Sequence, residues 1–359
     1  MAHCSDPTYR LLAARFLRRH AKQLAAELDG VCRGEDIEYI HRARVASRRL
    51  RAALDMFRDC WCRKELKRWR KQIRRITKGL GAARDKDVQS EYLSGVLGAV
   101  VDPACSPGIA RLLVHVEHQR EALQPDVVAA VDRLQHSGIL RRILRKTRKV
   151  LHRTPALSPG PSEFTFAETK RFIFSRLEEL LQEQDGLKHP TDAPRHHAMR
   201  IAAKQLRYTM EIAKPVYAGH LEKYIESMRR VQSLLGDIHD CDVWLQHLDD
   251  FSRQECGRIE AASGSAARCA RLEPGIRFLK QDRSHRRTEA FGELVVFWRE
   301  LKLQGTWERM SRMVELRGVE PPGEKPSSSA AAAAARPKSN GSSPRRKVPH
   351  GIQRKTAGK

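Results

Sequence analysis

The stretch that decides the fold is His41-Arg-Ala-Arg-Val-Ala-Ser-Arg-Arg-Leu-Arg51, because the chain contains it twice. The second copy is His197-Ala-Met-Arg-Ile-Ala-Ala-Lys-Gln-Leu-Arg207, 156 residues further on. Each copy is followed by an apolar run and then by a Leu-Gly segment, Leu80-Gly81-Ala-Ala-Arg-Asp85-Lys-Asp87 and Leu235-Gly236-Asp-Ile-His-Asp240-Cys-Asp242. These two segments are 155 residues apart, one residue fewer than the two basic stretches. A loop that is one residue shorter accounts for the difference. The pattern predicts two copies of one helical unit.

Almost every segment has the 3.6-residue periodicity of amphipathic helices, and almost none alternates with a period of two. The sequence therefore predicts an all-α fold. The expected helices run near 8–29, 36–58, 62–80, 86–100, 107–122, 126–136, 138–152, 165–184, 192–214, 219–235, 240–254, 258–281, 284–302 and 305–315.

A break containing Pro, Gly and Ser at 154–163 divides these helices into two parts. We expect one domain over 5–317, with halves of about 5–153 and 164–317. From 318 to 359 the sequence consists mainly of Pro, Ser, Ala, Lys and Arg and has no aromatic residue. Such a tail cannot bury a core, so we predict that it is disordered.

Basic residues are in large excess, since 68 Lys and Arg stand against 43 Asp and Glu for a net charge of +25. Between 41 and 84 there are 16 Lys or Arg and only three acids. The segment 141–153 adds seven cations and no acid. A surplus of this size predicts attraction to polyanions, namely nucleic acid, an anionic membrane or a phosphate polymer.

On a helical wheel the first copy separates into an apolar face and a cationic row. The apolar face contains Ala43, Ala46, Leu50, Leu54 and Phe57. The row beside it extends over about 15 Å of helix and consists of His41, Arg44, Arg48 and Arg51. Like charges at these spacings repel one another, so a bound anion is the simplest explanation for them.

The second copy keeps both features. Its apolar face contains Met199, Ala202, Leu206, Met210 and Ala213, and its row consists of His197, Arg200, Lys204 and Arg207, with Tyr208 as a further hydroxyl donor. Guanidinium groups match phosphate oxygens in bidentate geometry, and a polyanion would favour the protonated form of each histidine. The other flank of the helix is cationic only in the first copy, so a general demand for solubility explains the repeated row poorly.

The helix that follows each copy also has matched positions. Its core residues are Leu66, Trp69, Ile73, Ile76 and Leu80 in the first half and Leu221, Tyr224, Met228, Val231 and Leu235 in the second. Arg74 and Arg75 correspond to Arg229 and Arg230, whereas Lys71 and Lys78 have no cationic counterpart. The alternative interpretation is that these charges form ordinary solvated helix faces. Two matched copies make that alternative less favoured.

These motifs resemble the CHAD family, the conserved histidine α-helical domain, whose pattern is His-x-x-Arg-[Val/Ile]-x-x-[Arg/Lys]-x-Leu-Arg followed by Leu-Gly-x-x-x-Asp-x-Asp in each half. Both motifs occur twice here, and the resemblance covers roughly residues 5–315. It implies two pseudo-symmetric four-helix bundles, a duplicated unit whose basic helices line a central groove or pore. It also implies binding of inorganic polyphosphate. The copies differ at Arg49 and Gln205, which leaves open how alike the two walls are.

Carried over by position, and with Lys71 and Lys78 added on charge alone, the expected polyphosphate-binding residues come from both halves. They are His41, Arg44, Arg48, Arg51, Lys71, Arg74, Arg75, Lys78, Arg84, His197, Arg200, Lys204, Arg207, Tyr208, Arg229 and Arg230.

The paired aspartates, Asp85 with Asp87 and Asp240 with Asp242, resemble metal ligands in spacing. Because each pair follows a glycine that marks a helix end, we expect them instead to cap the next helix and to pair with arginines of the basic rows. We predict no metal and no cofactor. Phosphate-binding, dinucleotide-binding and nucleophile-elbow motifs are absent from the sequence, so we also predict that the protein is not an enzyme.

Eight scattered cysteines without a CxxC motif favour reduced thiols over a disulfide framework. The first residues lack the pattern of a signal peptide, and no apolar stretch is long enough to cross a membrane. We therefore expect a cytoplasmic protein without membrane contact. The expected partner is inorganic polyphosphate, with association to polyphosphate granules as an extension. The alternative is a nucleic-acid-binding helical protein, in which the basic tail contacts RNA or DNA.

Overall fold

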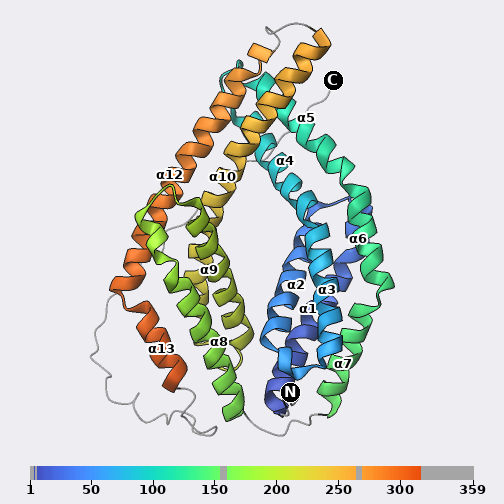
Figure 1. The fold of residues 1–359 in the computed structure, drawn as a ribbon, viewed down its shortest axis with the longest axis vertical. Helices are drawn as coiled ribbons and strands as arrows, with labels where there is room; N and C mark the ends of the chain where they lie inside the picture. Colours follow the sequence, from blue (N-terminus) through green and yellow to red (C-terminus); the bar gives the residue numbers. More distant parts are fainter. Residues whose placement is uncertain (1–3, 5, 154–159, 264–268, 317–359) are drawn as a thin grey trace, which may run out of the picture. The chain divides into compact units, whose positions relative to one another are not determined.

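The computed structural model describes residues 4, 6–153, 160–263 and 269–316, and within them every regular element is helical, which confirms the all-α fold (Figure 1). The helices of the first part of the chain are α1 (Pro7–Arg33), α2 (Ile37–Met56), η1 (Arg58–Cys60), α3 (Arg63–Gly79), α4 (Gly81–Ala99), α5 (Ser106–Ala122), α6 (Gln124–His136) and α7 (Ile139–Arg153). Those of the second part are α8 (Glu163–Gln182), η2 (Gln184–Lys188), α9 (Ala193–Ala213), α10 (Glu222–Ser263), α12 (Glu273–Leu303) and α13 (Thr306–Leu316). The tail predicted at 318–359 lies outside the described residues.

Side-chain caps set the starts of the two helices that contain the basic rows. Asp36 accepts a hydrogen bond from the backbone N–H of Glu38 at the start of α2. At the start of α9, Asp192 accepts one from the N–H of Arg195, and Pro194 occupies the first turn. An aspartate at this position satisfies a backbone donor that the helix leaves unpaired, and proline suits the first turn because it has no N–H to satisfy.

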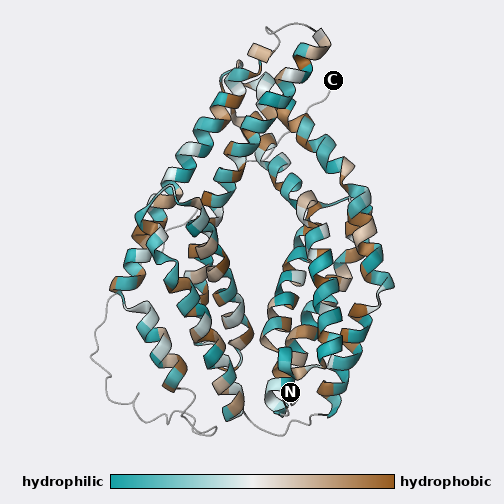
Figure 2. Cartoon of the chain, in the orientation of Figure 1, coloured by the Kyte–Doolittle hydropathy of each residue, from teal (hydrophilic) through white to brown (hydrophobic). Residues whose placement is uncertain are grey.

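Two hydrophobic cores lie on either side of the break at 154–163. The first core is built mainly from α1, α2, α3, α6 and α7, with the fully buried Phe57 and Trp69 among its largest side chains, and Ile212 of α9 also belongs to it. The second core is built from α8, α9, α13, the first part of α10 and the last part of α12, and it includes the buried Tyr217. Figure 2 shows the apolar positions recurring along the helices of both groups. Leu12 packs against both cores.

A third core joins elements from both sides of the break. It contains Leu93 of α4 and Ile109 and Leu112 of α5, together with Trp244 of α10 and Leu279 of α12, all buried. The helices α5 and α12 therefore pack directly against each other. The backbone comes so close there that a Cβ atom on either Gly108 or Gly275 would lie 2.2 Å from a carbonyl oxygen of the other helix region.

The apolar stripes predicted from the helical wheel are confirmed. Every residue of the four stripes, two on α2 and α9 and two on the helices that follow them, is buried in the first or second core. Burying each leucine, isoleucine, valine, methionine or phenylalanine of these stripes stabilises the fold by about 1.5 to 3 kcal/mol relative to leaving it in water. The same burial fixes which face of α2 and α9 remains available to a ligand.

The helix boundary expected at Gly236 is wrong, because α10 runs without interruption from Glu222 to Ser263. A glycine inside a helix costs about 1 kcal/mol relative to alanine. The side chains that α10 contributes to the second and third cores outweigh this cost, so Gly236 and Gly257 remain helical.

The capping role expected for the aspartates is also wrong. The helix α4 begins at Gly81, with only Leu80 between it and α3. Asp85 and Asp87 are therefore in the second turn of α4, where backbone N–H groups already have helical partners. Asp240 and Asp242 lie in the interior of α10.

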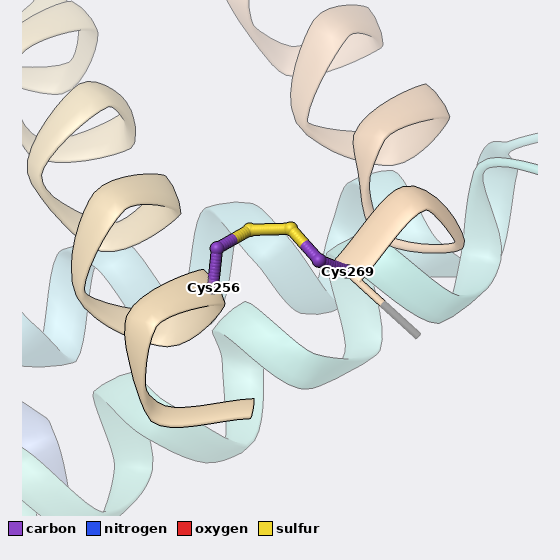
Figure 3. Close-up of a disulfide and its surroundings, with 2 residues drawn as sticks. All are labelled: Cys256 and Cys269. Carbon is purple, nitrogen blue, oxygen red and sulfur yellow. A yellow bond between two sulfur atoms is a disulfide. The ribbon is translucent and has the colours of Figure 1, made fainter. Parts of the chain in front are cut away.

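One pair of cysteines departs from the expectation of reduced thiols. Cys256 near the end of α10 and Cys269 form a disulfide, with their Cα atoms 5.3 Å apart (Figure 3). That separation is normal for a disulfide. Their spacing of 13 residues gives no signal of a disulfide in the sequence. The remaining six cysteines are free thiols.

Among the described helices, none is both long enough and apolar enough to cross a membrane.

Candidate anion-binding site

The cationic rows of α2 and α9 face each other. The two helices are in contact, and Lys204 of α9 lies close enough to Arg48 and Arg44 of α2 for their charges to act on it. Burial, followed by the charges of Arg200 and Arg48, lowers the pKa of Lys204 to about 8. Burial is the largest cause of this low pKa, and the neighbouring positive charges lower it further. The fold thus brings together two rows that are 156 residues apart in sequence.

A hollow of about 300 Å³ opens where α2, α8 and α9 meet. Its lining combines residues of both rows with a further arginine of α8. The residues are Arg48, Arg51, Ala52, Asp55, Met56, Phe172, Arg176, Ile201, Lys204, Gln205, Tyr208 and Thr209. Four of the five charged side chains in it are cationic, so the hollow suits an anion.

The row on α2 keeps its guanidinium groups away from carboxylates. Arg44 donates from Nη1 to the backbone oxygen of Thr77, at 3.1 Å. In the described part of the chain, Arg44, Arg48, Arg51 and Arg84 have no carboxylate oxygen within 4.0 Å. The Nε atom of Arg48 and the Nη1 atom of Arg84 are buried without a hydrogen-bond partner. The described part of the protein therefore leaves these two cationic groups without an acceptor of its own.

The surroundings of His41, at the head of this row, disfavour the protonated form of its ring. Burial, followed by the positive charge of Arg84, lowers its pKa below the ordinary value for histidine. Burial and the charges of His239 and Arg200 lower the pKa of His197 in the same way. A polyanion bound beside either ring would shift its pKa upwards again.

The row on α9 is largely neutralised from within. Arg200 lies 3.9 Å from a carboxylate oxygen of Asp240, and Arg207 forms an ion pair with Glu211 and donates to Gln232 at 2.9 Å. His197 is stacked on His239, with ring centroids 4.9 Å apart. Lys204, like His197, has no carboxylate within 4.0 Å among the described residues.

Glu211 connects the two helices. Its carboxylate binds Arg207 on its own helix and Arg49 of α2, the latter at 3.2 Å. Its side chain is only 12% exposed. One buried carboxylate between two guanidinium groups holds α2 and α9 together beside the hollow.

The glycines of the two Leu-Gly segments lie beside the arginines of the rows. A Cβ atom on Gly81 would be 3.0 Å from Nη1 of Arg44, and one on Gly236 would be 3.9 Å from Nε of Arg200. The glycine at 81 leaves room for the Arg44 guanidinium group, whereas a side chain at 236 would make only an ordinary contact with Arg200. In the first half, this contact gives a physical reason why the two motifs occur together.

The first aspartates of the two segments lie close to each other and to the rows. Burial, opposed by the positive charge of Arg44, raises the pKa of Asp85, and the negative charge of Asp240 raises it further. The ion pair between Arg200 and Asp240 confirms the expectation that these aspartates pair with row arginines in the second half.

The second aspartates of the segments bind arginines that lie outside the predicted set. Asp87 binds Arg120 of α5 and Asp242 binds Arg287 of α12, each at 2.5 Å. A sequence signal for them exists, because Pro107-Gly108-Ile109 recurs as Pro274-Gly275-Ile276, with an offset of 167 residues. Arg120 and Arg287 share that offset. This offset differs from the 155 and 156 residues of the other two motifs, so the third pair of matched segments was not recognised from the sequence.

The predicted α3 residues lie apart from the α2 row. Arg75 and Lys78 line a different hollow, of about 540 Å³, between α3 and α6. Lys71 and Arg74 are exposed, as are Arg75 and Lys78, and no described contact connects any of the four with the α2 row. Arg84 of α4, by contrast, lies beside His41.

The second-half counterparts of these arginines are also engaged elsewhere. Arg229 binds Glu226 at 2.6 Å, and Arg230 lies over the ring of Phe297 on α12, 4.2 Å from its centroid. Tyr208 is buried in the wall of the α2–α9 hollow, with the Arg207 guanidinium 4.6 Å above its ring. The residues brought together are thus His41, Arg44, Arg48, Arg51, Arg84, Arg200, Lys204, Arg207 and Tyr208, and His197 lies at the start of the same row on α9.

The described side chains contain no group of three or more His, Cys, Asp or Glu that could hold a metal ion. What the arrangement offers is a set of uncompensated cations with free N–H donors at a contact between two helices.

A family model confirms the resemblance, since the CHAD domain model matches residues 15–249. The chain belongs to the CHAD family. The match includes both basic rows and both Leu-Gly segments of this CHAD protein.

Solved structures support the same fold. The CHAD domain from the plant Ricinus communis is 21% identical with a TM-score of 0.57, covering 83% of this chain and 93% of that one. PptA from Streptomyces chartreusis is 16% identical with a TM-score of 0.55, covering 82% and 99%. A curated relative, the uncharacterized protein MT2285 of Mycobacterium tuberculosis (strain CDC 1551 / Oshkosh), is 23% identical over 246 residues, or 68% of this chain. The match spans only 45% of that relative's length.

Proposed function

We propose that the facing rows of α2 and α9 bind inorganic polyphosphate and that this CHAD protein does so without catalysing a reaction. The observation that carries the proposal is Lys204, a largely buried ammonium group with Arg48 and Arg200 as its charged neighbours. Uncompensated like charges destabilise the folded protein. A polyanion between the two helices would offset that repulsion.

The donor chemistry favours a phosphate polymer. The α2 row presents guanidinium forks at one-turn intervals, and each fork matches two oxygens of one phosphate group. A chain with a phosphate on every unit can therefore engage successive arginines along the row. Single-stranded nucleic acid also needs exposed aromatic platforms for its bases. Of the two aromatic residues in the lining of the hollow, Tyr208 is buried and Phe172 is only partly exposed, which favours the phosphate polymer.

The same binding would place the protein on polyphosphate granules in the cytoplasm. That role requires affinity for long chains and no turnover of them. Both requirements belong to the proposal.

The test is the binding of long-chain polyphosphate to the full chain at about 150 mM salt. The variant Arg48→Gln/Lys204→Gln removes two cations that make no ion pair with a described carboxylate. The matched control Arg299→Gln/Arg312→Gln removes two exposed cations of α12 and α13. We expect the first variant to lose about a hundredfold or more in affinity, since a hydrogen bond to a charged group contributes about 1.5 to 3 kcal/mol. The control should change by less than about twofold.

Equal losses in the two variants would show that only net charge matters and would overturn the proposed site. Release of phosphate from polyphosphate with Mg²⁺ present, above that of a heat-denatured sample, would overturn the non-enzymatic part. RNA that displaces polyphosphate at equal phosphate concentration would favour the nucleic-acid alternative for this site.

A further inference from the structure

The surface formed by α3 and α7 is cationic over its whole exposed extent. The eight exposed positions of α3 between 63 and 78 are all Lys or Arg, namely Arg63, Lys64, Lys67, Arg68, Lys71, Arg74, Arg75 and Lys78. The seven exposed positions of α7 are all basic as well, namely Arg141, Arg142, Arg145, Arg148, Lys149, His152 and Arg153. We call this surface the outer basic face.

The two helices of the outer basic face lie side by side. They are in contact, and Lys146 of α7 binds Glu65 of α3 at 3.1 Å. Glu65 is the single acid in the sequence of the two helices, and this ion pair occupies it. None of the basic side chains exposed on this face has a carboxylate within 4.0 Å among the described residues.

The corresponding surface of the second half is different. Where α3 exposes only cations, the first turns of α10 expose Glu222 and Glu226 beside Lys223, Arg229 and Arg230. Glu222 forms an ion pair with Lys214, and Arg229 with Glu226. A surface that exists only for solubility would be expected to mix charges in this way in both halves. The outer basic face therefore points to a ligand of its own.

We propose that the outer basic face binds the phosphate backbones of double-stranded nucleic acid without reading its sequence. The cations of α3 extend over about 22 Å along the helix, and those of α7 over about 18 Å. Packed helices lie about 8 to 10 Å apart, so the face presents two neighbouring rows of charge. The two backbones that border a DNA groove are separated by a similar distance, about 6 to 12 Å.

This geometry distinguishes a duplex from the other polyanions. A single polyphosphate strand can follow one row of cations but leaves the other unused. A membrane-binding face needs exposed apolar side chains that enter the lipid. The exposed large hydrophobic residues of the described chain lie outside α3 and α7. The proposal is independent of polyphosphate binding between α2 and α9.

The experiment measures binding of the full chain to a labelled 24-base-pair DNA duplex between about 100 and 300 mM NaCl. The test variant replaces by glutamine four exposed cations that are not part of the proposed polyphosphate site, namely Lys64, Arg68, Arg145 and Lys149. The matched control replaces four exposed cations on α12 and α13, namely Arg299, Lys302, Arg309 and Arg312. Both variants keep the basic tail and lose the same net charge.

We expect the test variant to lower the slope of log affinity against log salt by about 3 to 4, because each phosphate contact contributes about 0.9. Its affinity at about 100 mM NaCl should fall at least about tenfold, while that of the control changes less than about twofold. Both variants should retain their far-ultraviolet circular dichroism and their affinity for polyphosphate.

Equal losses of DNA affinity in the test variant and the control would overturn the proposal. Unchanged DNA affinity in both variants would overturn it as well, because other parts of the chain would then bind the duplex. Vesicles of phosphatidylserine and phosphatidylcholine are measured in parallel. A test variant that loses vesicle binding but keeps DNA binding would make the face a membrane contact instead. One equivalent of polyphosphate that displaces the duplex would show that the two ligands share one site.

Discussion

The basic rows of α2 and α9 contain nearly the same side chains, yet their charges are balanced differently. On α2, Arg48 and Arg51 have no described carboxylate within 4.0 Å. On α9, Arg200 and Arg207 are each paired with an acid of the same protein. The repeated motif therefore places cations at the same positions of both helices but does not determine whether a carboxylate pairs with them. The α2 row offers free donors to a ligand, whereas the α9 row contributes chiefly through Lys204.

The largest effect should come from Glu211, which joins α9 to α2. Replacing Glu211 by Gln leaves Arg49 and Arg207 without their shared partner in a mostly buried position. We expect a loss of about 3 kcal/mol in the free energy of unfolding, as for other broken buried ion pairs. Urea denaturation followed by circular dichroism measures it. Glu226→Gln, which breaks an exposed pair with Arg229, serves as the control and should cost less than about 1 kcal/mol.

The next effect compares one arginine from each row. Arg48→Gln should lower polyphosphate affinity by about 2 kcal/mol, roughly thirtyfold, because it removes free donors to a charged ligand. Arg200→Gln should lower it only about threefold, because Asp240 already engages that guanidinium group. Titration calorimetry with both single variants decides the point. If Arg200→Gln costs as much as Arg48→Gln, the difference between the rows has no bearing on binding.

A third effect follows from Lys204, whose pKa is about 8. Lysine binds an anion in its protonated form, so protonation is nearly complete at pH 7 and largely lost at pH 9. We expect polyphosphate affinity to fall about tenfold over that interval, since one pH unit above the pKa leaves about one protein in ten protonated. Lys204→Arg should bind well and remove the dependence, because arginine does not titrate there. A pH profile unchanged by this substitution would assign the dependence to another group.

The smallest change in polyphosphate affinity should come from a substitution that makes the α9 row resemble the α2 row. Asp240→Asn removes the carboxylate nearest Arg200 and leaves the guanidinium free for the ligand. Because Asp240 is 61% exposed, solvent screens the pair and the gain should be modest, about 0.5 kcal/mol or roughly twofold in affinity. A loss of affinity instead would mean that Asp240 positions Arg200 for the ligand rather than competing with it.

Much of the fold follows from the sequence, because apolar periodicity reports burial directly. The helical spacing of Ala43, Leu50 and Phe57 alone assigns them to a core, and all three are buried. Helix ends were harder. The glycine signal was the same in both halves, yet Gly81 begins a helix and Gly236 lies inside one. Packing against distant elements decides between these outcomes, and local sequence does not contain that information.

For the candidate site, the sequence indicated which helices carry the rows but not which cations remain unpaired. That property depends on acids far along the chain, as with Glu211, which binds Arg49 across 162 residues. Charge alone also placed Lys78 in the same site as the α2 row, although the fold turns it towards α6. The spacing of the cysteines did not predict the disulfide between Cys256 and Cys269.

The uninterrupted α10 has a consequence for local unfolding, the process that exposes backbone amides to hydrogen exchange. Its 42 residues extend over about 63 Å and contribute buried side chains to both the second and the third cores. Neither core can lose its structure without exposing amides of a helix that the other core also holds. Amide hydrogen exchange should therefore protect Ile238 and Leu248 to the same degree, as parts of one cooperative unit. In energetic terms, we expect the helices on both sides of the break to form one folding unit.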